Sequence, residues 1–481
     1  MPEQLTGPWL LGSVTLPVFA AAGTSLIDRV RPARALAAGA GGGSLVLLTV
    51  AGADLKARGA ALLVDPWDPG QLLAGGALFA LDELRSLLLP FTALLFTFVA
   101  LAMPRAKSDP RGARRLLLAL ASSLGLLAAD SATLAAVLWA VSCWPLMAEL
   151  RVRGARATAR VFGLYMLVST VLLFVGLLLT EIDLADNATG HAWASGLLFA
   201  AVMIRKGIVP LHSWVPELFE HASLPSSILF TTPQVGAYMA IGWALGGAPQ
   251  WLLTVAALFA AFTALYGAGL TLVQDSPRRL FGWFFVSQSA LVLVGLHCRT
   301  PLGLAGGLLW WLSSGLALAG FGMTLAALEA RRGALSLRSP AGGYEKMPLL
   351  AVSFLLLGLA SVGFPGTLGF VGSEALVEGA VEQSPWVGFA VILATACNGI
   401  TVMRTYFLLF CGARAHASGA QRLRPRERAA FLGLVALLLA GGIFPGPLLA
   451  SRYHAAESIL RARAIASETL PARATGVSSG R

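Results

Sequence analysis

Long apolar segments alternate with short polar connections along almost the whole chain. Fourteen of them are long enough, at about 20 residues, to cross the hydrocarbon core of a bilayer as helices. These segments cover residues 8–27, 35–53, 86–103, 114–129, 131–148, 160–180, 190–209, 224–246, 250–272, 279–297, 302–327, 347–376, 386–411 and 429–450. Because backbone groups in lipid need internal hydrogen bonds, helices are the expected structure. The pattern predicts an all-α polytopic membrane protein with about 14 transmembrane helices.

Two of these predicted helices are interrupted. The seventh contains Gly207 and Pro210 directly after two cations, and the twelfth contains Pro365 and Gly366 before a glutamate. The two breaks lie five helices apart. Broken helices at matching positions of two halves are typical of transporters built from inverted repeats, and a repeat with an odd number of helices inverts. Two unrelated proline kinks are the alternative, but the charges beside the breaks favour the repeat.

The breaks predict how the chain is divided. We expect three N-terminal helices, a first inverted repeat of helices four to eight, a second of helices nine to thirteen, and a final helix with a basic tail. These parts correspond to residues 1–103, 104–247, 248–412 and 413–481.

Composition and charge support a membrane protein. The chain is 57% hydrophobic and 12% charged, whereas soluble domains have roughly 25% charged residues. A net charge of +11 is also found in nucleic-acid-binding proteins. Most of the 35 Lys and Arg residues, however, fall in connections on one side of the predicted membrane topology, which is the positive-inside pattern. We expect no nucleic-acid partner, contact with the lipid bilayer of a bacterial inner membrane, and both termini on the outer, periplasmic side.

The sequence has no motif for a cofactor or a metal. Its four cysteines, Cys143, Cys298, Cys397 and Cys411, fall within or at the ends of predicted helices without a CxxC pair. There is no glycine-rich nucleotide fingerprint after a strand, and there are no paired intramembrane histidines for haem. We expect no metal and no cofactor in this chain.

The first break is also the main concentration of charge. Residues 205–225 contain two cations, two histidines and two glutamates in an otherwise apolar region. Charge at membrane depth is costly, so such residues usually serve a function. Arg205 and Lys206 are either the functional cations of the first half or anchors between helices. His212 is equally well explained by a structural hydrogen bond and by proton entry.

This segment resembles a known family. Residues 205–217 and 221–226 are similar to the K-x-x-x-x-P-x-H-x-W-L-P-[DE] and H-x-x-x-P-x-S signature of the antiporter-like subunits of respiratory complex I. Multisubunit cation/proton antiporters, membrane hydrogenases and inorganic-carbon uptake complexes share this core. Residues 278–288, 365–372 and 403–412 resemble later family motifs in the correct order. The resemblance covers most of the chain.

The resemblance implies a function and a set of partners. Family members work in multisubunit membrane complexes and move protons along a hydrated axis. This axis uses a glutamate in helix five, lysines in helices seven and eight, and ionisable groups in helices eleven and twelve. The expected function is therefore a proton-conducting or antiporter-like membrane subunit of an energy-converting complex of the NADH:quinone oxidoreductase type. Its expected partners are other membrane subunits and protons or another cation, with no redox chemistry in this chain.

The chain departs from the family at nearly every axis position. The positions matching the family's ionisable residues are Ala140, Arg205, Gln234, Trp310, Ser314 and Ser373. Arginine keeps its proton in proteins and is a poor carrier, whereas lysine can exchange one. Lys206 and Glu374 directly follow two of the changed positions and are candidates to replace them.

These considerations give a candidate proton path. It consists of Arg205, Lys206, His212, Gln234, Glu374 and Arg404, with Glu217 and His221 as candidate entry residues. Glu374 and Glu378 share one helix face, which favours a functional role over packing. Arg404 has the alternative of holding a carbonyl group or Glu374. The alternative function is a non-conducting scaffold that keeps the fold with a degraded proton relay.

Overall fold

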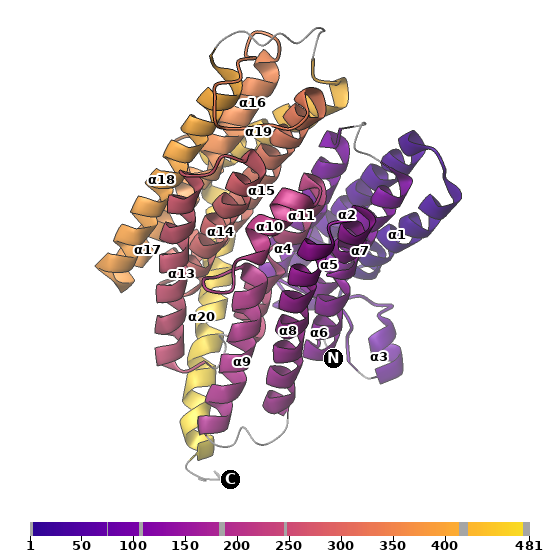
Figure 1. The fold of residues 1–481 in the computed structure, drawn as a ribbon. Coiled ribbons are helices and arrows are strands. Elements are labelled where there is room, and N and C mark those ends of the chain that lie inside the picture. The colour runs from indigo at the N-terminus through magenta and orange to yellow at the C-terminus, as the bar shows by residue number, and fades with distance from the viewer. Residues whose placement is uncertain are drawn as a thin grey trace.

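The computed structural model describes residues 3–74, 76–104, 109–181, 188–244, 248–412 and 422–474, and most of them are helical (Figure 1). The first helices are α1 (Trp9–Gly23), α2 (Val30–Arg58), α3 (Pro69–Ala74), α4 (Glu83–Ala102), α5 (Pro110–Ala128), α6 (Ala132–Val141), α7 (Trp144–Val152) and α8 (Arg156–Glu181). The central ones are α9 (Ala188–Lys206), α10 (Trp214–His221), α11 (Leu224–Thr231), α12 (Val235–Met239) and the π-helical turn η4 (Ala240–Ala244). The last are α13 (Gln250–Thr271), α14 (Pro277–Leu296), α15 (Pro301–Arg332), α16 (Pro348–Ser361), α17 (Leu368–Gln383), α18 (Pro385–Phe410), α19 (Pro425–Ile443) and α20 (Gly446–Ala474).

The polytopic all-α class predicted from the sequence is confirmed. Among the described residues, nine helices are long and apolar enough to cross a membrane, and α19 with α20 form one further pair bent by 74°. Other predicted segments are divided into shorter helices, such as α11 and α12 or α16 and α17. The count of fourteen and the division into two inverted repeats stay predictions.

A small sheet is the one element of another kind that the sequence pattern missed. Strand β2 (Leu62–Val64) pairs in parallel with β1 (Glu3–Gln4) and antiparallel with β3 (Ala80–Asp82). The strands are two or three residues long, too short to show a periodic pattern. They lie in the connections around α2 and α4.

Both predicted helix breaks are confirmed. Helix α9 ends at Lys206, and Gly207 follows with a φ of +68°. Helix α16 ends at Ser361, and Gly363 and Gly366 have φ values of +78° and +87° before α17 begins. Glycine adopts this left-handed region without the steric cost that a Cβ brings. The chain therefore reverses its local direction at both sites where the sequence has glycine and proline.

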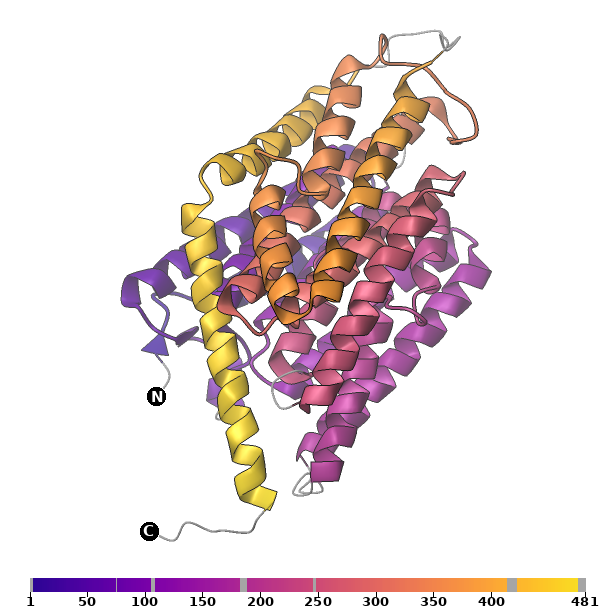
Figure 2. The same ribbon diagram turned by 90° about the vertical axis from the view of Figure 1, so that its left-hand side faces the viewer.

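The residues that follow the last predicted segment, 429–450, are helical up to residue 474. Helix α20 continues to Ala474 and runs along one side of the bundle (Figure 2). Its Arg452 is fully buried and donates hydrogen bonds to the carbonyl groups of Glu83 and Leu84, at 2.8 and 3.2 Å. Arg463 donates to the Leu296 carbonyl at 3.1 Å. Arginines that appear solvated in the sequence instead attach this helix to α4 and α14.

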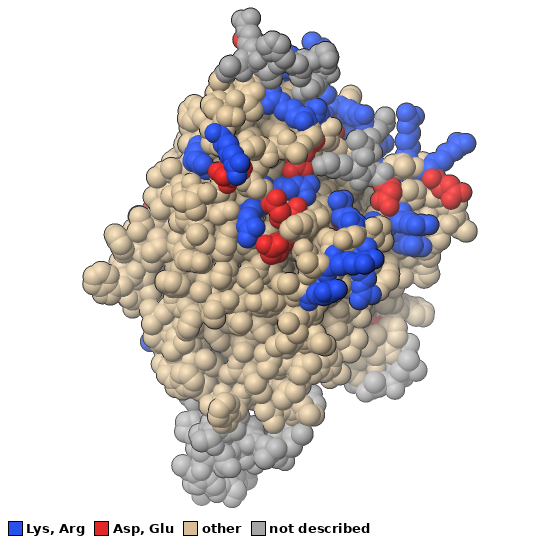
Figure 3. All heavy atoms as spheres, viewed as in Figure 1, with Lys and Arg blue, Asp and Glu red and all other residues tan. Residues whose placement is uncertain are grey.

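Positive charge gathers at one end of the molecule. Figure 3 shows Lys and Arg side chains concentrated around the upper part of the bundle, while both chain ends lie at the lower part in Figure 1. We call the upper part the cation-rich end; it includes the start of α5, the end of α7, the start of α14 and the end of α15. Several of its cations are paired, as in the double contact of Arg278 with Glu329 at 2.6 and 2.7 Å.

Glycines let α15 approach its neighbours backbone to backbone. A Cβ added to Gly379 of α17 would lie 2.2 Å from the Cα of Gly303, and one added to Gly307 would lie 2.6 Å from the Cα of Gly295 on α14. Small residues allow such close packing of helices in membranes. The α14, α15 and α17 helices thus form the tightly packed centre of the second half.

This packing predicts the effect of a single methyl group. Gly379→Ala should lower the free energy of unfolding by about 1–3 kcal/mol, because its methyl group overlaps the α15 backbone. The midpoint of thermal unfolding in detergent measures the change. Gly399→Ala on α18 is the matched control, since an added Cβ there meets no atom within 4 Å. Equal midpoints for both variants would contradict the close approach.

Candidate functional site

The break after α9 is built so that its backbone groups are satisfied. Trp214, the first residue of α10, donates its indole N–H to the carbonyl of Ile204 at 2.9 Å. The Val209 amide donates to the hydroxyl of Thr263 on α13 at 3.1 Å. A Cβ on Gly207 would lie 2.5 Å from the Val215 side chain. The break is therefore a fixed structure, and it holds the two cations at the end of α9 in place.

Arg205 is buried among neutral groups. Its side chain donates to the Ser142 hydroxyl and to the sulfur of Cys143, both at 2.7 Å. Its guanidinium lies 4.8 Å from the ring of Trp139 and 4.2 Å from the ring of Phe230. Aromatic rings attract cations through their negative faces. The positive charge is thus held by hydrogen bonds and ring faces.

No carboxylate is paired with Arg205 among the residues that the structure describes. The family glutamate expected in helix five is Ala140, and the Arg205 side chain reaches the carbonyl of the residue before it, Trp139, at 3.5 Å. Arg205 thus contacts the face of this helix segment that carries Trp139, Ser142 and Cys143. Compared with the family pattern, a cation is present at position 205 and a carboxylate is absent at position 140.

Lys206 contacts Gln234, the second position where the family pattern has a lysine and this chain does not. Its ammonium group donates to the side-chain oxygen of Gln234, and both residues are buried. Gln234 adopts a left-handed conformation, with a φ of +51°, between α11 and α12. A Cβ on Gly236 would lie 3.0 Å from the Lys206 side chain. The glycine gives the lysine room to reach the glutamine.

A cavity with a volume of about 60 Å³ extends from the cation-rich end to Arg205. Its outer part is lined by polar residues at the ends of α5, α7 and α11, and its inner part by Ser142, Phe230 and Val235. The polar lining residues are Asp109, Arg115, Ser123, Ser142, Glu149, Arg153, Arg205, Ser223 and Ser226. Arg205 therefore faces the cavity, whereas Lys206 lies behind it with Gln234. This settles which of the two adjacent cations is reached from the cavity.

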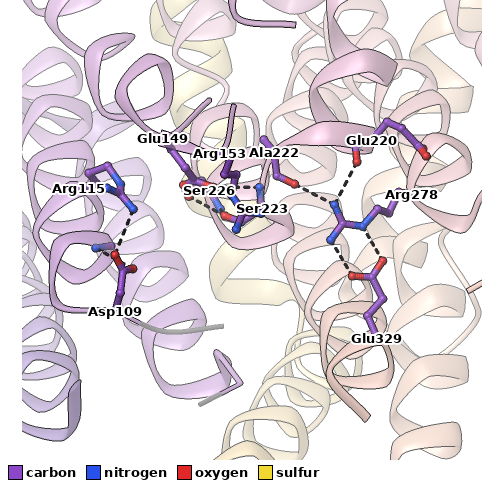
Figure 4. Close-up of polar contacts among 11 residues, drawn as sticks. Asp109, Arg115, Glu149, Arg153, Glu220, Ala222, Ser223, Ser226, Arg278 and Glu329 are labelled. Carbon is purple, nitrogen blue, oxygen red and sulfur yellow. Dashed lines mark hydrogen bonds and ion pairs between the residues drawn. The ribbon is translucent and has the colours of Figure 1, made fainter. Parts of the chain in front are cut away.

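Glu149 is the buried carboxylate of this cavity. It pairs with Arg153 at 2.8 Å, accepts from the Ser223 amide at 3.0 Å, and accepts from the Ser226 hydroxyl (Figure 4). Ser223 and Ser226 belong to the family-like segment that follows His221. The sequence did not single out Glu149, because the predicted helix ended at residue 148 and left Glu149 in a solvated connection. Its position in the apolar run of α7 was the available signal.

The predicted entry residues form a separate ionic group. Glu217 contacts His221 at 3.4 Å and Arg279 at 3.2 Å, at the surface of the cation-rich end. Neither residue is among the described residues that line the cavity. The ring of His212 packs against Tyr266 and Trp283, with centroids 5.6 and 5.0 Å away. Proton entry through these three residues stays a prediction.

The second half has polar axis groups without charge. The side chains of Gln288, Trp310 and Ser314 are buried, and their polar atoms have no hydrogen-bond partner among the described residues. Nearby polar contacts join Asn398 to Ser287 at 2.9 Å. Buried polar groups are normally hydrogen bonded to protein or to ordered water. We call Gln288, Trp310, Ser314 and Asn398, from α14, α15 and α18, the neutral polar groups of the second half. Trp310 and Ser314 stand at positions where the family pattern has ionisable residues.

Glu374 does not lie with the buried polar side chains of the second half. Gly372 and Leu376 of α17 face α15, where a Cβ on Gly372 would lie 2.9 Å from the Trp310 nitrogen. Residues two positions apart on a helix are about 200° apart, so Glu374 faces outward and is exposed, as is Glu378. Glu374 thus lies on a different face of α17 from Gly372, and its part in the proton path stays a prediction. The Ser373 hydroxyl donates to the Phe370 carbonyl at 2.8 Å.

Arg404 follows the alternative considered from the sequence. Its guanidinium donates to the carbonyl of Gln274 at the end of α13, at 3.4 Å. It thereby links α18 to the connection before α14. The contact is to a carbonyl group, and a part in the proton path stays a prediction.

Comparisons with known proteins agree with the architecture. Residues 155–399 match the family described as NADH:quinone oxidoreductase/Mrp antiporter, transmembrane. NAD(P)H-quinone oxidoreductase chain 4 1 of Synechococcus sp. (strain JA-3-3Ab) is 28% identical over 482 residues, which cover 92% of this chain and 91% of the relative. NADH-quinone oxidoreductase subunit 13 of Thermus thermophilus is 30% identical over 270 residues, which cover 54% and 56% of the two chains.

Solved structures give the same result. A chain of respiratory complex I from Thermus thermophilus superposes with a TM-score of 0.83 and 26% identity, over 94% of this chain and 99% of that one. A chain of the Mrp complex from Dietzia sp. superposes with a TM-score of 0.81 at 20% identity, over 97% and 99%, and shows the shared fold. Since the family match covers about half of the chain and the likeness extends over nearly all of it, this protein belongs to the NADH:quinone oxidoreductase/Mrp antiporter family of membrane subunits.

Proposed function

We propose that this chain moves protons as an antiporter-like membrane subunit of a multisubunit energy-converting complex related to NADH:quinone oxidoreductase. One observation carries the proposal: a buried lysine, Lys206, lies at a helix break just behind a polar cavity that opens at the cation-rich end. Val235, which follows its partner Gln234, lines that cavity. Lys206 can exchange a proton, and both its neighbour Arg205 and the residue after its partner, Val235, line the cavity that would hold water.

The proposed path divides its tasks among different residues. Glu149 is the carboxylate that takes up protons from the cavity, about 2.5 helical turns from the vacant family position at Ala140. Arg205 keeps its charge and orients water at the base of the cavity. Lys206, held by its hydrogen bond to Gln234, passes the proton to water that leads toward the neutral polar groups of the second half. Water at these buried polar atoms completes the path in the second half.

The orientation follows from the charge distribution. We place the cation-rich end on the cytoplasmic side of a bacterial inner membrane, since cytoplasmic connections carry an excess of Lys and Arg. Both termini then lie on the periplasmic side. The cavity accordingly opens to the cytoplasm, and protons enter the path there.

The outward carboxylates of α17 support a neighbouring membrane subunit as partner. Glu374, Glu378 and Glu382 are exposed and four residues apart, so they form one line along the helix. Carboxylates on a helix within the membrane avoid lipid. We propose that another subunit of the complex covers this face with basic side chains.

The first test concerns Lys206. Lys206→Arg keeps the charge and removes the ability to release a proton, so proton flux should fall by about tenfold or more. Flux is measured with the purified complex in vesicles carrying a pH-sensitive dye. Lys56→Arg, at an exposed lysine of α2, is the control and should leave the flux unchanged. If the assembled Lys206→Arg complex shows wild-type flux, the flux does not pass through Lys206 of this chain, and the non-conducting scaffold is then the better interpretation.

The second test separates the carboxylate of Glu149 from its ion pair. Glu149→Gln keeps one oxygen acceptor for the Ser223 amide and places an amide N–H donor beside the Ser226 hydroxyl, but it cannot take up a proton, so flux should drop by roughly tenfold or more. Arg153→Gln breaks the same ion pair and leaves the carboxylate in place, and it should retain most of the flux. The proposed role of Glu149 fails if Arg153→Gln reduces the flux as strongly as Glu149→Gln.

The third test concerns the partner face. Glu378→Lys should weaken association with the neighbouring subunit by roughly tenfold or more, because the new lysine would face the basic side chains that we propose for the partner and repel them. The amount of partner that co-purifies with the tagged chain in mild detergent measures this. Glu345→Lys reverses a charge at the other end of the molecule and should not affect the yield. An unchanged yield for Glu378→Lys would place the partner on a different face.

A further inference from the structure

The charges around the cavity do not balance. Its lining includes three arginines, Arg115, Arg153 and Arg205, and two acids, Asp109 and Glu149. Asp109 lies 3.6 Å from Arg115 and accepts from the Gly112 amide, and Glu149 lies 2.8 Å from Arg153. Figure 4 shows these two ionic contacts at the outer part of the cavity. The remaining positive charge belongs to Arg205, at the base.

Arg205 is surrounded by hydrogen-bond acceptors and aromatic rings, and all of these groups are neutral. It is 6% exposed, and its hydrogen bonds go to a hydroxyl, a sulfur atom and a carbonyl group. An unpaired charge that has lost its water is costly to bury. Ring faces offset only part of this cost. A mobile anion that enters through the cavity would supply the missing charge.

We propose that a small monovalent anion of the halide class binds at the base of the cavity against Arg205. The guanidinium provides charge and N–H donors, and Ser142 lines the same wall with a hydroxyl. A single negative charge restores neutrality. The apolar neighbours Leu229 and Phe230 of the cavity wall favour a weakly hydrated ion over a doubly charged one, whose dehydration costs more.

The anion would stand in for a side chain that this protein lacks. In the family pattern a glutamate occupies position 140, within the segment 139–143 that the Arg205 side chain contacts. A covalent carboxylate at position 140 and a bound halide therefore compete for the same role. This inference concerns binding alone and holds whether or not the chain moves protons.

Equilibrium binding of radioactive chloride to the purified complex tests the proposal. The wild type should show a saturable site for each copy of this chain. Arg205→Gln removes the charge, and Ala140→Glu supplies an internal anion, so both should weaken binding by roughly tenfold or more. Arg160→Gln, which removes an exposed cation of α8 outside the cavity, should bind chloride like the wild type.

The midpoint of thermal unfolding is a second measure of chloride binding to the wild type and to the variants. Chloride should raise the midpoint of thermal unfolding relative to gluconate, since a ligand that binds the native state stabilises it. This difference should disappear in Ala140→Glu, which retains Arg205 and does not depend on the folding of Arg205→Gln. The proposal is overturned if the wild type shows no saturable binding, or if Ala140→Glu binds chloride as the wild type does. Vesicle flux plays no part in either measurement, so failure here is separate from failure of the proposed proton path.

Discussion

A charge removed from water must be compensated where it lies, and this requirement organises the molecule. Guanidinium groups have several N–H donors and can use carbonyl groups as well as carboxylates. Arg278 uses both kinds: it holds Glu329 and donates to the carbonyls of Glu220 and Ala222, at 3.1 and 2.9 Å. The start of α14, the end of α15 and the end of α10 are thereby joined in one place (Figure 4). The carbonyl groups at helix ends, which lack partners within their own helix, become structural ligands for arginine.

The same requirement makes the first half of the proposed path unusual. A buried charge pair can be replaced by two apolar residues at little cost to stability. Here one partner is Ala140 while Arg205 remains, surrounded by sulfur, hydroxyl and ring contacts. Keeping the cation alone indicates that its charge still has a use. Because Lys206 directly follows Arg205, whatever neutralises Arg205 also influences how readily that lysine is protonated.

The sequence predicted the features that depend on local chemistry, and missed those that depend on rotation and contact. The breaks at Gly207 and Gly366 follow from residue types that tolerate a positive φ, and both were placed correctly. Glu374 was considered as a replacement for Ser373 because it directly follows that position, but a shift of one residue turns a helix by about 100°. Glu149 was lost at a helix boundary. The helical course of α20 depends on carbonyl partners far away in the sequence, for which no local pattern exists.

The two halves of the molecule therefore differ in the kind of polar group that they bring inward. The first half combines a carboxylate, two cations and an amide, so a proton can be held there on a side chain. The second half offers Gln288, Ser314 and Asn398, which donate and accept hydrogen bonds but do not gain or lose a proton near neutral pH. A proton crossing it must reside on water. Transfer through this part is then controlled by hydration of the space between α14, α15 and α17, where glycine contacts fix the helices at their closest approach. Movement of α17 is thus the change that would most affect this hydration, and its outward carboxylates are where a neighbouring subunit would act on it.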